Sequence, residues 1–176
     1  MKTYFNRTVR FVLILSSLSL AAAGSAFAQS ATASADASAT IIQPIAISKT
    51  SNLVFGNYAV GATAGSVSLS TADAVTVNSG AITQPTGNKG NPAAAVFAVT
   101  GEGSFTYAIT LPSDGAVSLT GAGAPMPVTG FVSNPATTGT LTAGAQNIKV
   151  GATLNVGASQ VPGAYTGAFS VTVAYN

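Results

Sequence analysis

The side chains most often used in catalysis are scarce in this sequence. Histidine and cysteine are absent, so the chain has no imidazole base, no thiolate and no metal site that uses histidine. A serine with a lysine base is the remaining nucleophile option. None of Lys49, Lys89 and Lys149 has a serine three residues before it, however, so the S-x-x-K pattern is missing.

The acidic residues offer no better catalytic group. There are four, far apart in the sequence, and nothing suggests that two of them converge as a glycosidase pair: Asp36, Asp73, Glu102 and Asp114. The clustered Asp and Asn pattern of a calcium loop is absent too. We therefore expect no enzymatic activity, no cofactor and no bound metal.

Carbohydrate binding is the other chemistry to weigh. Tyr58 and Tyr107 could offer stacking faces to a sugar, although the chain has no tryptophan. Both tyrosines lie in apolar strand-like segments. The sequence favours core residues with hydrogen-bonded hydroxyl groups, and it leaves the sugar-binding alternative open.

Residues 1–28 have the pattern of a secretory signal. An apolar run (11–20) too short to span a bilayer precedes an Ala26-Phe27-Ala28 cleavage motif, and the segment begins with three basic residues: Lys2, Arg7 and Arg10. Cleavage would leave a chain that begins at Gln29 and has no transmembrane segment. We expect export through the inner membrane to the periplasm, the cell surface or the medium.

Charge is sparse once this signal is removed. Three lysines then face four acids, so the formal net charge changes from +2 to −1. Three scattered lysines cannot neutralise the phosphates on which nucleic-acid affinity depends, which excludes a nucleic-acid partner. Charged residues make up only 6% of the full chain, against about 25% in ordinary globular proteins. Such a neutral surface suits a subunit that packs against neighbours.

The positioning elements are strands. Short runs rich in β-branched and aromatic residues recur between Gly, Pro and Asn, and they predict about ten strands: 40–47, 53–58, 66–70, 74–77, 94–100, 104–111, 116–120, 128–133, 146–156 and 163–176. The loop Gly101-Glu102-Gly103 predicts a hairpin. We expect one all-β domain at 41–176, an Ig-like antiparallel β-sandwich without disulfides.

The last predicted strand alternates strictly. Apolar residues stand at the odd positions and hydroxyl-bearing residues lie between them, which predicts one apolar and one polar face: Tyr165, Phe169, Val171, Val173 and Tyr175 against Thr166, Ser170 and Thr172.

Residues 29–40 alternate in a different way. Five alanines alternate with Ser, Thr and Asp from position 30 onward, and Ile41 follows: Ala31, Ala33, Ala35, Ala37 and Ala39. The segment is either a strand with a shallow inner face or a flexible leader. Its composition favours the leader, because alanines bury little surface.

The C-terminal segment resembles the last strand of subunits in chaperone-usher pili. Tyr175 is the penultimate aromatic residue and Gly163 lies fourteenth from the end, within the alternating pattern. This resemblance implies a sandwich that lacks one strand, and a donor strand from the next subunit, about Ala31 to Ile41, that fills the groove. It also implies copies of the chain or related subunits, and a periplasmic chaperone, as partners.

The chain as a whole resembles the exported bacterial family DUF4402, a domain of unknown function. The similar segments run from ATIIQPIAI through LVFGNYAVG to LNVGASQVPGAYTGAFSVTVAYN. This resemblance implies a β-sandwich in the envelope or outside the cell, and it implies no activity.

Two functions are therefore expected. The preferred one is a non-catalytic structural subunit of a surface appendage or extracellular matrix that assembles by strand complementation. The alternative is a self-contained secreted module, its strand self-supplied, that binds a glycan or surface polymer through loops such as 83–92 and 121–127.

Overall fold

The computed structural model describes residues 29–176, so the predicted signal at 1–28 lies outside the described residues. Contacts divide the chain into two units, Met1–Thr40 and Ile41–Asn176. Within the first unit, residues 29–40 form no helix or strand, and every one of them is exposed.

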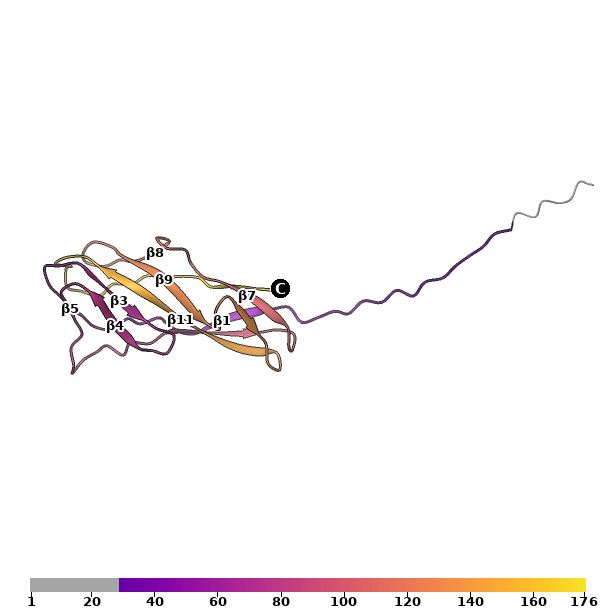
Figure 1. Ribbon diagram of the computed structural model, residues 1–176, viewed down its shortest axis with the longest axis horizontal. Helices are drawn as coiled ribbons and strands as arrows, with labels where there is room; N and C mark the ends of the chain where they lie inside the picture. Colours follow the sequence, from indigo (N-terminus) through magenta and orange to yellow (C-terminus); the bar gives the residue numbers. More distant parts are fainter. Residues whose placement is uncertain (1–28) are drawn as a thin grey trace, which may run out of the picture. The chain divides into compact units, whose positions relative to one another are not determined.

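The unit Ile41–Asn176 is all-β, which confirms the predicted fold class (Figure 1). It contains twelve strands: β1 (Ala46–Ser51), β2 (Ala59–Val60), β3 (Gly65–Leu69), β4 (Val75–Ser79), β5 (Ile82–Thr83), β6 (Ala95–Thr100), β7 (Thr106–Thr110), β8 (Val117–Leu119), β9 (Met126–Asn134), β10 (Thr138–Thr140), β11 (Ala145–Val156) and β12 (Thr172–Tyr175).

Every strand pairing is antiparallel, and the long strand β11 organises the larger sheet. This sheet has the order β1-β6-β11-β3-β4, and β9 pairs with the other side of β11 and with β8. One side of β11 changes partner near Gly151, since Val150 pairs with Ala95 of β6 and Ala152 with Leu69 of β3. A smaller sheet has the order β10-β7-β12, and β2 pairs with β5.

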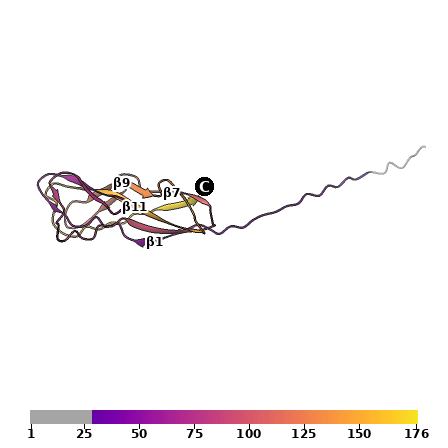
Figure 2. The same ribbon diagram turned by 60° about the horizontal axis from the view of Figure 1, so that its bottom comes forward.

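Inward-facing side chains form two core clusters. One lies under β3, β8 and β9 and includes Val67, Val128 and Leu154, and the other lies between β6, β7 and the first half of β11 and includes Val99 and Ile148. Alternate residues of β6 are buried, as expected for a strand with one face on the core. The turned view in Figure 2 shows β1 and β7 on opposite sides of this unit.

Several sequence predictions were wrong. The strand predicted at 40–47 begins only at Ala46 and continues to Ser51, because Pro44 cannot donate to a ladder. The loop Gly101-Glu102-Gly103 does not make a hairpin, because β6 pairs with β1 and β11 whereas β7 pairs with β10 and β12. The loop carries the chain from one sheet to the other. Residues 53–58 form no strand beyond a single bridge between Val54 and Ala93, because Gly56 interrupts the extended backbone with φ +101°, at a position where a Cβ would collide with the Lys89 carbonyl.

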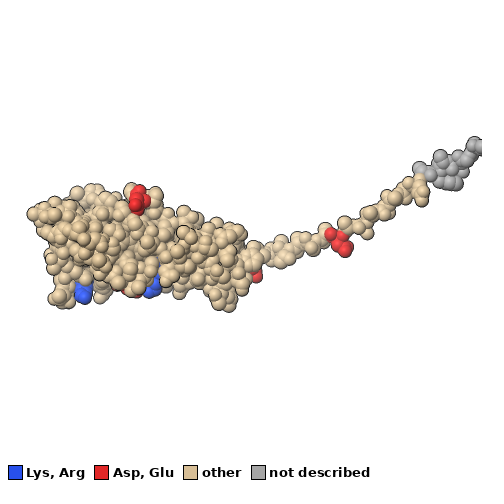
Figure 3. Space-filling view, viewed as in Figure 1, with Lys and Arg blue, Asp and Glu red and all other residues tan. Residues whose placement is uncertain are grey.

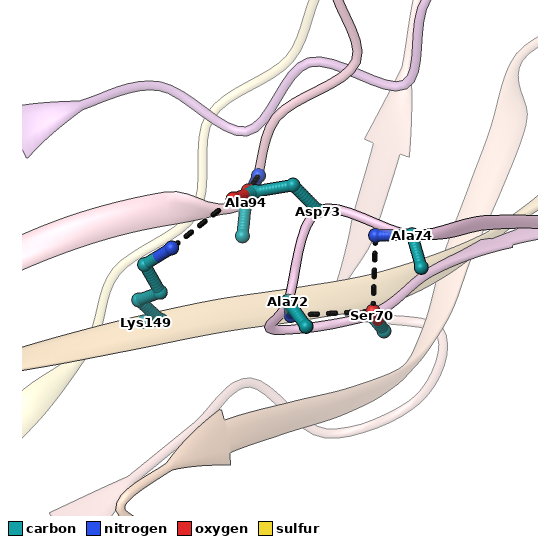
Figure 4. A network of polar contacts seen from close by, with 6 residues as sticks. All are labelled: Ser70, Ala72, Asp73, Ala74, Ala94 and Lys149. Atoms are coloured by element: carbon teal, nitrogen blue, oxygen red, sulfur yellow. Dashed lines mark hydrogen bonds and ion pairs between the residues drawn. The ribbon is translucent and has the colours of Figure 1, made fainter.

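A charged network holds the β3–β4 turn against the two strands beside it (Figure 4). Asp73 Oδ1 accepts the Ala94 N–H at 2.7 Å, and Asp73 Oδ2 lies 3.1 Å from Lys149 Nζ. The Ala94 hydrogen bond and the nearby Lys149 ammonium lower the pKa of Asp73. Ser70 Oγ accepts two backbone N–H groups across the same turn. The carboxylate therefore links the turn to the start of β6 and to β11.

A candidate strand-binding groove

The first strands of the folded unit are paired on one side only. β1 pairs with β6, Val54 pairs with Ala93, Asn57 N–H donates to Lys89 O, and β2 pairs with β5. We call residues 46–60 the N-terminal edge. Among residues 29–176, this edge has no strand partner besides these, since β1 is the end strand of its sheet and β2 pairs with β5 alone.

The last segment is also paired on one side. Thr166 bridges to Thr120, and β12 pairs with β7. Between Thr166 and Thr172 no ladder partner is present among the described residues. We call residues 161–175 the C-terminal edge.

The two edges run in opposite directions and meet at both ends. At one end Ser159 N–H donates to Gly61 O at 2.9 Å. At the other end the Tyr175 hydroxyl donates to Gln43 O at 2.9 Å. Between these contacts lies a groove of about 1260 Å³ that both edges line.

The floor of the groove is apolar and belongs to the protein core. It is formed mainly by Phe55, Phe97, Met126, Val128, Phe131, Leu154 and Phe169. Phe169 packs edge-on against Phe97, with ring centroids 6.0 Å apart, and tilted against Phe131 at 5.1 Å. Several floor side chains are already less than a tenth exposed. An occupant would therefore add a shallow layer over a packed floor.

Four of the predicted assembly residues line this groove, namely Gly163, Tyr165, Phe169 and Val171, whereas Val173 and Tyr175 lie beyond its lining in β12. Val171 is buried and four more odd-numbered residues are partly buried: Tyr165, Phe169, Val173 and Tyr175. Their even-numbered neighbours from Thr166 to Thr172 are exposed. Regular strand is shorter than the alternation predicts, since it covers only Thr172–Tyr175. Gly163 is exposed with φ +152° and lies near the start of the C-terminal edge.

The predicted donor residues are not among those that line the groove. Ala31, Ala33, Ala35, Ala37 and Ala39 are exposed and lie in no strand. Ile41, at the start of the folded unit, is 93% exposed. An isoleucine in that state leaves nearly all of its apolar surface in water.

The two tyrosines considered for sugar stacking serve other purposes. Tyr107 is fully buried, and its hydroxyl donates to Gln146 Oε1 at 2.7 Å. Tyr58 is partly buried, and its hydroxyl donates to Phe55 O at 2.6 Å. Burial raises the pKa of both phenols. Tyr107 presents no face to solvent, and Tyr58 contributes to the groove lining.

Sequence patterns did not identify the N-terminal edge as part of a site. Leu53, Phe55 and Tyr58 line the groove. Their segment, LVFGNY (53–58), nevertheless has the apolar pattern of an ordinary core strand. Only the absence of a paired neighbour distinguishes it, and pairing is not visible in a single segment of sequence. Among residues 29–176, no group of three or more His, Cys, Asp or Glu side chains is placed to hold a metal.

The comparison with protein families agrees with this architecture. The family model described as Domain of unknown function (DUF4402) matches residues 45–175. The chain belongs to this family. The DUF4402 match includes both edges of the groove and ends before Asn176. No curated protein and no solved structure matches the chain significantly. Within the described part, no helix has the length and apolarity needed to cross a bilayer.

Proposed function

We propose that this DUF4402 protein is a non-catalytic, exported structural subunit of a surface appendage or extracellular matrix, and that it assembles by strand complementation. The observation that carries the proposal is the apolar groove between two antiparallel edges. A sandwich with two edges over its core, each paired on one side only, is an incomplete structure that invites an added strand. The volume of about 1260 Å³ exceeds that of most small-molecule pockets.

The proposed occupant is the leader of a second copy, residues 30–41. Its alanines suit a shallow groove whose floor is already packed, because a larger side chain would displace the rings beneath. Its even-numbered Ser, Thr and Asp would face solvent. Ile41, exposed in the single chain, would supply the one large apolar anchor.

The inserted strand would pair with both edges at once. Running antiparallel to the C-terminal edge, it would lie parallel to the N-terminal edge, because the two edges oppose each other. Antiparallel pairing is the slightly more stable of the two ladders. The added backbone hydrogen bonds would supply affinity, and alternate side chains would set the register.

Strand donation of this kind produces an open assembly. The donor surface (the leader) and the acceptor surface (the groove) are different parts of the same chain. Such a heterologous contact repeats without closing unless the rotation between copies makes a ring. The surface itself favours close packing, since Figure 3 shows few charged side chains on the face that carries β3, β4, β9 and β11 in the view of Figure 1.

The proposal also includes export of the chain and its binding by a chaperone. Residues 1–28 would direct the chain across the inner membrane, to function at the cell surface or outside the cell. Before assembly the groove would be open to unwanted pairing. We propose that related subunits and a periplasmic chaperone are partners, and that the chaperone pairs with the C-terminal edge, Gly163 to Tyr175.

Cysteine cross-linking between two variants tests the proposal, because the chain has no cysteine of its own. One variant carries a leader cysteine (Ser34→Cys, Asp36→Cys or Ser38→Cys), and the other carries Ser170→Cys on the exposed side of the C-terminal edge. We expect a mixed disulfide dimer for at least one leader position.

The matched control replaces Ser170→Cys by Thr76→Cys, which is exposed on β4 and outside the groove. Equal cross-linking to Thr76→Cys, or none to Ser170→Cys from any leader position, would overturn strand donation. Binding of the purified protein to a glycan array without self-assembly would instead support the self-contained binding module.

A further inference from the structure

Tyr175, in β12 just beyond the groove lining, makes a compact set of contacts to Gln43, which lies shortly after the start of the folded unit at Ile41. The Tyr175 hydroxyl accepts the Glu102 N–H at 2.6 Å and donates to Gln43 O at 2.9 Å. Glu102 Oε2 accepts the Gln43 N–H at 3.0 Å. Both backbone polar groups of Gln43 are therefore engaged.

The Tyr175 ring is itself held firmly. It packs edge-on against Phe105, with centroids 5.7 Å apart, and its backbone pairs with Tyr107 in β7. Its hydroxyl lies so close to Gly101 that a Cβ at that position would collide with it. The glycine is therefore needed for the contact, and the hydroxyl has little freedom to move away from Gln43.

The next residue restricts the backbone further. Pro44 has a fixed φ, and it keeps Gln43 in the extended region. β1 then begins at Ala46. For a chain to fill its own groove, its leader would have to reverse direction over residues 42–45 and return along the N-terminal edge.

That reversal is unfavourable for two reasons. The two-residue hairpin turns that match strand twist need positive φ, which Pro44 cannot adopt and the β-branched Ile45 resists. The reversal would also pull Gln43 away from Glu102 and Tyr175, which costs the hydrogen bonds described above.

We propose that Gln43, Glu102 and Tyr175 form a clasp that prevents the chain from filling its own groove and so directs the leader to a second copy. This inference rests on the proposed function. The clasp makes donation intermolecular because it fixes the backbone just after the leader ends. Pro44 makes this part of the backbone stiffer. Tyr175 acts here as a positioning residue.

The test is amide hydrogen exchange of residues 161–171 in the exported chain (29–176), measured in dilute monomer and in assembled material. Tyr175→Phe removes the hydroxyl and keeps the ring. We expect these amides to exchange more slowly in the dilute Tyr175→Phe monomer than in the dilute wild-type monomer, because the loss of about one net hydrogen bond that opposes self-filling raises the ratio of self-filled to open chains about fivefold. Assembly should fall in parallel.

Tyr107→Phe is the matched control, because it removes a tyrosine hydroxyl that donates to Gln146 Oε1, lies outside the groove lining and makes no hydrogen bond with Gln43. It should leave exchange and assembly unchanged. Glu102→Ala tests the clasp independently of the Tyr175 ring and should also slow exchange in the monomer, whereas Glu102→Gln retains an acceptor and should not.

The outcomes separate the two proposals. If wild-type chains never assemble and never protect residues 161–171, the proposed function fails. If wild-type chains assemble, and Tyr175→Phe and Glu102→Ala assemble equally well with unprotected monomers, strand donation stands and the clasp is refuted.

Discussion

Truncation of Phe169 tests the groove quantitatively. The ring packs on Phe97 and Phe131 and is partly buried. A fully buried phenylalanine changed to alanine costs about 3–5 kcal/mol, so we expect Phe169→Ala to lower the free energy of unfolding of the empty domain by about 2–3 kcal/mol.

The remaining exposed part of the ring faces the groove. It amounts to some tens of Å², because an aromatic side chain buries about 150–250 Å² when fully covered. At about 25 cal/mol per Å², covering it contributes on the order of 1 kcal/mol to strand binding. Phe169→Ala should therefore weaken binding of a leader peptide about fivefold.

The assay combines urea unfolding with calorimetric titration of a peptide covering residues 29–42 into a chain that begins at Ile41. Val99→Ala is the control, since Val99 is fully buried in β6 and lies outside the groove lining. It should cost about 2 kcal/mol in unfolding and leave peptide affinity unchanged. Equal peptide affinity for wild type and Phe169→Ala, or an equal loss in Val99→Ala, would refute the groove as the binding site.

Three further substitutions test the fold. Asp73→Asn should lower the free energy of unfolding by less than about 1 kcal/mol at pH 7. Folding lowers the pKa of the Asp73 carboxyl group, so the charged form stabilises the fold only above that pKa. Urea unfolding of wild type and variant should therefore show this difference vanish as the pH falls below about 4. Gly139→Ala should lower the unfolding free energy by about 1–3 kcal/mol, because its Cβ would collide with the Tyr107 ring, whereas Gly87→Ala meets nothing and should change little. Tyr107→Phe should cost about 1 kcal/mol in the same unfolding assay, through the lost hydrogen bond to Gln146.

Alternation along a strand was visible in the sequence, because side-chain direction has a period of two whatever the partner. The five predicted inward residues are all buried or partly buried: Tyr165, Phe169, Val171, Val173 and Tyr175. The extent of regular strand was not predictable, because it depends on a partner for the backbone. Residues 167–171 alternate correctly and yet have no ladder partner in the described chain.

Features that depend on distant residues escaped sequence analysis. The same apolar pattern fits a hairpin and a crossing between sheets, so the loop after β6 was assigned to the wrong one. Asp73 and Lys149 are far apart in the sequence, and the pairing of β11 with β3 and β6 brings them together. The groove exists because a neighbouring strand is missing, and the residue types of Leu53 and Phe55 do not show that absence.

The most direct measurement of strand donation is amide hydrogen exchange of the exported chain over a range of protein concentrations. We predict that residues 30–41, 53–60 and 161–171 become protected together as concentration rises, because the donor and both edges of the groove form one ladder. Protection of 161–171 that does not change with concentration, or assembly that leaves residues 30–41 unprotected, would contradict strand donation between copies.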